Sequence, residues 1–324
     1  MEKNTKLVIV DSESAGMRLD LFLSVKLGIT RSQAQKLISG NSVLINNAQP
    51  KKTGEKVSEG DNITIEAPGP NPISTTETPI VSTHEFRIED IKIIKETPEY
   101  LIIEKPWGML THSTGKHETD SLAELLVKKY PELSKIGEDP LRPGIVHRLD
   151  KEASGLLVIP RTTAMFDHLK NLFKTRQMDK EYIVLVHGQV EKDWDEINFP
   201  ITRSRTSDRM AAIPETLKGE KNDEGQRAKT EFWVEKRFVN FTLLKVKIHT
   251  GRMHQIRAHF LAYNHPAVGD PLYFQKKIKR TWDEKLGRLF LHCCHLAFTD
   301  LNGTTVSFTS SLPKTLGDFL EILK

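Results

Sequence analysis

The 324-residue sequence predicts an α+β protein, with a small N-terminal domain ahead of a larger one built on a mixed, largely antiparallel sheet. In the larger part, strand-like apolar segments outnumber helical ones, and many alternate apolar with polar residues, as half-buried strands do. A wound parallel α/β fold would instead need a helix between nearly every pair of strands. Residues 67–84 are rich in Pro and Thr and poor in large apolar side chains, which predicts a linker. We expect the domains at residues 16–66 and 85–324.

Two short helices open the N-terminal domain in this prediction. The first begins at Arg18 and ends before Gly28, because glycine accommodates the left-handed backbone of a helix end. Thr30 and Gln33 form a capping box for the second helix, which ends at Gly40. Two strands follow, at residues 43–45 and 63–65.

Basic residues gather around the second of these helices. Arg31 and Lys36 lie on its polar side, and Lys51 and Lys52 add two more positive charges in the following loop. A small unit with a basic face is suited to binding the phosphate backbone of RNA. We therefore expect these four side chains to contact RNA.

This N-terminal part resembles the S-four-type (alpha-L) RNA-binding domain, first known from a protein of the small ribosomal subunit. The residues that carry the resemblance are Arg18-Leu19-Asp20, Arg31-Ser32, Ile38, Gly40, Val43 and Asn46. The resemblance implies a small α/β module that docks RNA.

In the larger domain, strand-like and helical runs follow one another along the chain. The strands are predicted at residues 91–94, 101–103, 156–159, 182–186, 241–248, 289–298 and 305–308. The helices are predicted at residues 122–130, 165–176, 253–263 and 315–323.

Composition limits the class of protein. Hydrophobic residues make up 38% and charged residues 28% of the chain, and the formal net charge of +4 is compatible with a nucleic-acid partner. No apolar run reaches the roughly 18–20 residues of a membrane span, and the polar segment Met1–Asn4 lacks the apolar core of a secretory signal. The two cysteines, Cys293 and Cys294, are neighbours, so an ordinary disulfide between them cannot cross-link distant parts of the fold. We therefore expect a cytoplasmic protein with no membrane partner.

A run of metal-ligand types, His292-Cys293-Cys294-His295, does not predict a metal site. Successive side chains of a strand point to opposite faces, so four neighbours cannot converge on one tetrahedral ion. Phosphate-binding loops, Gly-x-Gly-x-x-Gly turns and Gly-x-Ser-x-Gly elbows are also absent from the sequence. We expect no metal and no cofactor.

The remaining candidate for chemistry is a charged elbow, residues 143–158. His147, Arg148, Asp150, Lys151 and Glu152 crowd together just before a strongly apolar strand. From the residues alone, this elbow is either a solvated turn with structural ion pairs or a site that presents the Asp150 carboxylate at the edge of the core.

The elbow resembles the defining motif of the RluA family of pseudouridine synthases, His-Arg-Leu-Asp-x-x-Thr-Ser-Gly-Leu. Further motifs of that family follow in order at Glu104-Lys105-Pro106-Trp107-Gly108 with His112, at Lys180-Glu181-Tyr182, at Gly251-Arg252-Met253-His254-Gln255-Ile256-Arg257, at Gly269-Asp270-Pro271-Leu272-Tyr273 and at Arg288-Leu289-Phe290-Leu291-His292. The departures from the family pattern are Glu104, Ala153 and Met253, and they concern local packing. The resemblance covers residues 90–324.

The resemblance implies an enzyme that breaks the C1′–N1 bond of a uridine in RNA, rotates the uracil and rejoins it through C5. Asp150 would be the essential carboxylate, as nucleophile or as base, and Arg257 would pair with it and keep it ionised. Tyr182 would pack against the uracil and could assist proton transfer. Arg148 would fill the place of the flipped-out base or hold a phosphate. No cofactor is required.

Several alternatives remain open at this point. The expected substrate is large-subunit ribosomal RNA, with transfer RNA as the alternative, and the target uridines are not encoded in any motif. A non-catalytic RNA-binding or ribosome-assembly factor on the same scaffold would differ by lacking Asp150, Tyr182 or Arg257, all of which are present. A hydrolase would want a second carboxylate placed beside Asp150. We expect a monomer.

Overall fold

A computed structural model describes most of the chain, and contacts divide it into two compact units, residues 1–83 and 84–324. The described residues are 5–27, 34–35, 37–38, 40, 42–50, 52, 54–66, 86–113, 120–139, 142–204, 209–214, 225–275, 277–278 and 280–323. Each unit has a hydrophobic core of its own.

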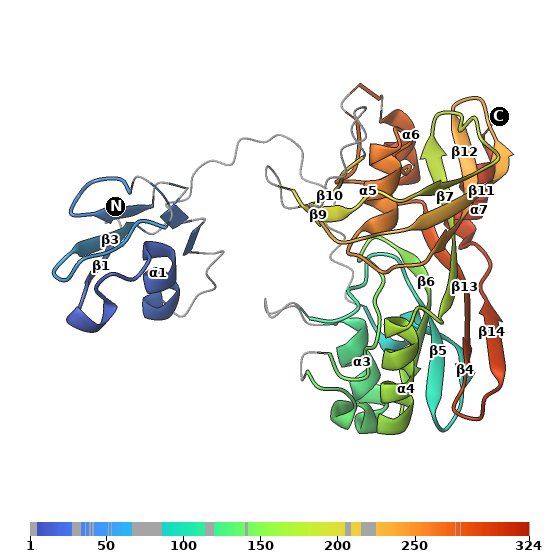
Figure 1. Ribbon diagram of the computed structural model, residues 1–324, viewed down its shortest axis with the longest axis horizontal. Helices are drawn as coiled ribbons and strands as arrows, with labels where there is room; N and C mark the ends of the chain where they lie inside the picture. Colours follow the sequence, from blue (N-terminus) through green and yellow to red (C-terminus); the bar gives the residue numbers. More distant parts are fainter. Residues whose placement is uncertain are drawn as a thin grey trace. The chain divides into compact units, whose positions relative to one another are not determined.

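The N-terminal unit is a small sheet with a helix packed on it (Figure 1). Its elements are β1 (Thr5–Ile9), a 3-10 turn at Ser12–Ser14, α1 (Leu19–Leu27), β2 (Val43–Ile45) and β3 (Asn62–Glu66). All pairings are antiparallel in the order β1-β3-β2. Leu19, Phe22 and Leu23 of α1 are buried against the sheet, so the apolar face of this helix forms the core.

The Arg18-Leu19-Asp20 triplet has a structural role in this unit. The Asp20 carboxylate is fully buried and accepts two hydrogen bonds from the Arg18 guanidinium, each 3.1 Å long. Gln35 Nε2 donates a third, of 2.7 Å, across 15 residues of sequence. Asp20 therefore ties the start of α1 to the residues around position 35.

The predicted first helix and both predicted strands of this unit are confirmed. The sequence did not predict β1, although its short apolar run adds a third strand beside β3. Of the predicted second helix, residues 34–35 and 37–38 are described and helical, whereas Thr30 and Gln33 lie outside the described residues, as does the linker predicted at 67–84.

A nine-stranded mixed sheet organises the C-terminal unit. Its strands are β4 (Lys92–Glu96), β5 (Tyr100–Lys105), β6 (Ser154–Pro160), β7 (Asp179–His187), β8 (Trp194–Ile197), β11 (Thr230–Arg237), β12 (Phe241–Ile248), β13 (Leu291–Thr299) and β14 (Thr305–Thr309). Their order is β4-β5-β6-β13-β7-β12-β11-β8, with β14 paired to β13, and β6–β13 is the parallel pair. The prediction of an α+β fold with a mixed, largely antiparallel sheet is confirmed.

Helices cover both faces of this sheet (Figure 1). They are α3 (Leu122–Lys129), α4 (Thr163–Lys174), α5 (Gln255–Ala262), α6 (Thr281–Leu286) and α7 (Lys314–Glu321), with 3-10 turns at Ile88–Asp90 and Pro131–Lys135. Outside the main sheet, β9 (Ile201–Arg203) and β10 (Met210–Ala212) form a two-stranded ribbon.

Alternation along β7 assigns its side chains to two separate cores. Tyr182, Val184 and Val186 pack in the main core with α3, α4 and α5, whereas Leu185 packs in a second core with α7. Because the strand period is two residues, Lys180 shares the face of Tyr182. Lys180 and Tyr182 on this face line a pocket.

The structure of this unit differs from the sequence prediction in several elements and in the register of β13. The sequence did not predict α6 or strands β8 to β11. α6 and strands β8 to β10 are short, and β8 lies at the sheet edge. β11 is longer and lies between β12 and β8, but its second half is charged and exposed, which masks the strand period. The strict alternation expected for residues 292–295 is wrong, because a bulge between Cys293 and His295 shifts the register of β13 against β7.

Buried histidines make this unit sensitive to acid. Burial lowers the pKa of His259 and of His292 to about 4 from the ordinary 6.5. Between those values the unfolded chain binds more protons than the native protein, so stability is lost as the pH falls through this window. From about pH 7 to about pH 5, each histidine should lower the free energy of unfolding by about 2 kcal/mol.

Tryptophan fluorescence during urea unfolding measures this unit alone, because all four tryptophans lie within it, at Trp107, Trp194, Trp233 and Trp282. A His259→Gln variant, which cannot titrate, should lose about 2 kcal/mol less than the wild type over the same interval. Equal losses in the two proteins would contradict the assignment of acid sensitivity to His259.

Candidate active site

The charged elbow is held rigidly against the end of β5. Lys105 is fully buried, and its ammonium donates hydrogen bonds of 2.9 Å to the carbonyls of Pro106 and Met109 and a longer one of 3.4 Å to Lys151. Thr111 Oγ1 donates to Leu149 O at 2.8 Å. Burial lowers the pKa of Lys105 to about 7, which the nearby carboxylates of the elbow counteract. These contacts fix the backbone on both sides of residue 150.

A glycine lets the elbow approach the centre of the sheet. Gly155, the second residue of β6, has φ +122, and a Cβ there would lie 2.3 Å from the Cys293 carbonyl oxygen. Only glycine permits both this backbone and this approach to β13. The elbow is thereby brought beside the register pair Tyr182–Cys293.

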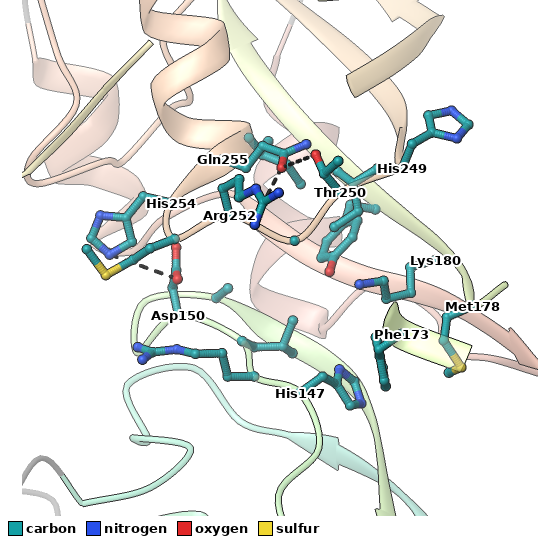
Figure 2. A pocket seen from close by; sticks show the side chains of 18 of the residues that line it. His147, Asp150, Phe173, Met178, Lys180, His249, Thr250, Arg252, His254 and Gln255 are labelled. Atoms are coloured by element: carbon teal, nitrogen blue, oxygen red, sulfur yellow. Dashed lines mark hydrogen bonds and ion pairs between the residues drawn. The ribbon is translucent and has the colours of Figure 1, made fainter. Parts of the chain in front are cut away.

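Asp150 lies at the mouth of the site, with its side chain 14% exposed. Its Oδ2 is 3.3 Å from Arg257 Nη1, and its Oδ1 is 3.9 Å from His254 Nε2. Figure 2 shows the Asp150 carboxylate turned toward His254 at the start of α5. The carboxylate therefore has the Arg257 guanidinium and the His254 imidazole as neighbours, and it also lines the pocket.

Arg257 is paired mainly with a residue other than Asp150. Its fully buried guanidinium forms a bidentate pair with Asp270, with Nε–Oδ2 at 2.7 Å and Nη2–Oδ1 at 2.8 Å. Glu152 Oε2 is a further acceptor, 3.0 Å from Nη1. Burial alone would lower the pKa of Arg257, but Asp270 and the other carboxylates raise it, so the arginine remains charged. The predicted Asp150–Arg257 contact is present as one edge of this larger cluster.

Tyr182 is buried on the face of β7 that carries the pocket. Burial, followed by the neighbouring Cys293 thiol, raises the pKa of its phenol well above 10.0. A phenol in this state presents a ring and a proton to a substrate, and it is a poor base at neutral pH.

A hydrogen-bonded pair orients the imidazole that faces Asp150. The Tyr273 hydroxyl accepts a hydrogen bond of 2.8 Å from Met210 N and lies 2.9 Å from His254 Nδ1. Since the Tyr273 oxygen already accepts, we assign its proton to the His254 Nδ1 contact, which leaves the imidazole proton on Nε2, facing Asp150. Burial lowers the pKa of His254, which favours this neutral form. His254 also has a left-handed backbone, at φ 55.

These residues surround a pocket of about 510 Å³. Its walls come from the elbow, the end of α4, the start of β7 and the segment 248–257 that leads into α5 (Figure 2). The volume suits a nucleoside, since pockets for small ligands span about 300–1,000 Å³. Arg148 lies in the wall with its side chain exposed, where it can reach a phosphate or a base.

Comparison with known proteins agrees with this arrangement. The family model described as RNA pseudouridylate synthase matches residues 99–262, and the S4 domain model matches residues 17–63. An RNA pseudouridine synthase of Aquifex aeolicus, itself uncharacterized, is 37% identical over 79% of this chain and 76% of its own length. The ribosomal large subunit pseudouridine synthase D of Buchnera aphidicola is 32% identical over 94% of both chains.

The chain belongs to the RNA pseudouridylate synthase family. The resemblance of its motifs to the RluA family is thereby confirmed, and so is the S-four-type domain. The fold agrees as well: human RNA pseudouridylate synthase domain containing 1 superposes with a TM-score of 0.58 at 22% identity, over 73% of this chain and 90% of its own. This pseudouridine synthase is an enzyme that isomerises uridine in RNA.

In this synthase, the structure brings Asp150, Arg257, Tyr182 and Arg148 to one pocket, as expected from the motifs. The sequence predicts no role for Asp270, Glu152, His254 or Tyr273, although all four stand inside the segments that resemble the family. Two of these residues could have been found from their place in a family motif, because Asp270 and Tyr273 both belong to the segment Gly269–Tyr273. The structure shows what this motif does: it supplies Asp270, the bidentate partner of Arg257.

Other predicted residues lie away from this pocket or outside the described chain. Arg31, Lys36 and Lys51 lie outside the described residues, and Lys52 is exposed on the N-terminal unit. Cys293 is buried behind Tyr182, whereas Cys294 is half-buried and its thiol donates to Glu181 O. Within the described chain, no three His, Cys, Asp or Glu side chains are grouped so that they could hold a metal ion. Every helix of that part is too short or too polar to cross a bilayer.

Proposed function

We propose that this synthase converts specific uridines of large-subunit ribosomal RNA to pseudouridine, with Asp150 as the essential catalytic carboxylate. The observation that carries the proposal is the Asp150 carboxylate at the wall of a nucleoside-sized pocket, 3.3 Å from the buried guanidinium of Arg257. The choice of ribosomal RNA is supported by relatives named ribosomal large subunit pseudouridine synthase D in Buchnera and Nitrosomonas, which match nearly the whole of this chain.

The geometry supports a different role for each of the four predicted residues in the pocket. Asp150 acts at the sugar, by attack on C1′ or by removing a proton, and both routes begin from the carboxylate. Arg257 orients Asp150 through Nη1, since its other donors are committed to Asp270. Tyr182 contributes a ring for the uracil and a proton that burial retains. Arg148, exposed at the rim, takes the place of the extruded base or holds a phosphate.

The experiment that tests this function compares ribosomal RNA from cells with and without the gene. Uridines that lose their modification in the deletion strain, and regain it when the purified enzyme acts on that RNA, are the substrates. If the modified positions map to transfer RNA and the large-subunit RNA is unchanged, the alternative substrate is correct. If no position changes in either RNA, neither of the two substrates is correct. We further propose that the protein is a monomer and works in the cytoplasm.

Deleting residues 1–70 should leave a folded, weaker RNA binder. The two units have separate cores, and the N-terminal one carries the S4 match and the predicted basic face. Removing that unit's phosphate contacts should weaken binding by about 10-fold or more and reduce the salt dependence of the affinity. Filter binding at several salt concentrations measures both, and an unchanged affinity with an unchanged slope would contradict an RNA-docking role.

A further inference from the structure

A lysine that has no counter-ion among the described residues faces the pocket from the strand that carries Tyr182. Lys180 lies two residues before Tyr182 on β7, so both side chains share the pocket face. The residue is 8% exposed, and its ammonium group lies 5.0 Å from the centre of the Phe173 ring. Figure 2 shows Lys180 pointing into the pocket across from Asp150. Within the described chain, its Nζ forms no hydrogen bond and no ion pair.

Burying an ammonium in this way is unfavourable unless a partner arrives. Burial lowers the pKa of Lys180, and the Phe173 ring supplies only a weak cation–π attraction. The other buried cations near the site are satisfied: Arg257 by carboxylates and Lys105 by backbone carbonyls. Lys180 therefore differs from them, since its charge is directed at the space that a substrate would occupy.

The proposed reaction creates a negative charge in that space. When the C1′–N1 bond breaks, its electron pair remains on N1, and the uracil becomes an anion whose charge is shared with O2 and O4. Meanwhile C1′ bonds to the Asp150 carboxylate, or C2′ gives a proton to Asp150 and a C1′–C2′ double bond forms. The uracil then rotates and C5 bonds to C1′, while the Asp150–C1′ bond breaks or C2′ regains its proton from Asp150. Finally C5 loses its proton and N1 gains one, so the overall change is an isomerisation. The detached uracil needs a positive partner during its rotation.

We propose that Lys180 is a catalytic residue of this synthase, whose ammonium donates a hydrogen bond to a carbonyl oxygen of the uracil anion. This role rests on the proposed function of the pocket. A flexible ammonium with three donors can follow the rotating base from O2 to O4, which a rigid guanidinium fork does less well. A preorganised donor to a developing oxyanion contributes about 10²–10³-fold in rate.

The experiment uses the full-length enzyme in excess over its RNA substrate, labelled with tritium at C5, and measures single-turnover tritium release. Lys180→Met, of similar length but uncharged, should be slower by about 10²–10³-fold, with RNA affinity within a few-fold. Lys180→Arg keeps the charge and should stay within about 10-fold of the wild type. The matched control is Lys245→Met, on neighbouring β12, whose ammonium lies 3.7 Å from Glu181 at the surface, and it should keep the wild-type rate.

A leaving-group comparison separates this role from a packing role. Fluorine withdraws electrons, so the anion of 5-fluorouracil is intrinsically more stable and needs Lys180 less. With RNA containing 5-fluorouridine, consumption of that nucleoside by Lys180→Met should approach the wild-type rate more closely than with uridine. An equal defect on both RNAs, or a Lys180→Met enzyme within about 3-fold of the wild type on uridine, would overturn the proposal. A wild-type enzyme that is itself inactive on the RNA would instead contradict the function assigned to the pocket.

Discussion

Asp150→Asn should abolish pseudouridine formation, with a fall in the single-turnover rate of about 10⁴-fold or more. Asparagine has the shape of the carboxylate but can neither attack C1′ nor take a proton from the sugar. Because asparagine fills nearly the same volume and Asp150 contacts Arg257 through a single 3.3 Å pair, the substitution removes little packing. RNA affinity should therefore stay within a few-fold of the wild type. Tritium release and filter binding on the same RNA measure the two quantities.

Glu152→Gln is the matched control for this prediction. Glu152 lies two residues away and approaches the same Arg257 nitrogen at 3.0 Å, but its side chain is 28% exposed and it does not line the pocket. Its loss should lower the rate by less than about 10-fold. If Asp150→Asn retains turnover, or if Glu152→Gln is equally inactive, the essential carboxylate has been assigned to the wrong residue.

The sequence predicts those residues of the site that stand in a recognisable motif next to a recognisable strand. Asp150 stands in an elbow before an apolar strand, and Tyr182 stands on a strand with a clear period of two, so their motifs and their elements can be recognised together. Asp270 lies 13 residues after Arg257 in a loop, and no periodicity relates them. Arg257 and Asp270 come together only because α5 packs beside the loop that follows it.

The fold shows the same limit. Strand β12 was predicted at its observed bounds because buried and half-buried residues alternate along it, with apolar side chains at Leu244, Val246 and Ile248. β11, TEFWVEKR, buries Phe232 in its first half but ends in exposed charged residues, so its period of two is too short to be recognised from the sequence. The bulge in β13 adds one residue to a strand, which a sequence pattern of period two cannot anticipate.

Asp270→Asn should destabilise the C-terminal unit by about 3–5 kcal/mol, far more than Asp150→Asn, which should change stability by less than about 1 kcal/mol. Both Asp270 and Arg257 have fully buried side chains, and Asp270 Oδ1 also accepts hydrogen bonds of 2.9 Å from Leu272 N and Tyr273 N. The amide of asparagine would turn a donor toward the guanidinium and leave its charge undercompensated. Urea unfolding followed by tryptophan fluorescence compares the two variants directly. Equal unfolding free energies would contradict the assignment of Asp270 as the principal partner of Arg257.

The double variant Arg257→Met, Asp270→Leu distinguishes the structural use of this pair from its chemical use. Replacing both members of a buried ion pair with apolar side chains of similar volume is often neutral or stabilising, so the cost of leaving the Arg257 charge uncompensated should be recovered. The cost of removing the acceptor of Leu272 N and Tyr273 N should remain. Activity should not recover, because Asp150 would have lost the Nη1 contact that orients it, and displacement of a reacting group by about 1 Å lowers rates by about 10²-fold. A double variant that is both stable and active would show that Arg257 serves the fold alone. A stable and inactive one would show that the buried Arg257–Asp270 pair is retained in this synthase because it holds the catalytic carboxylate in place.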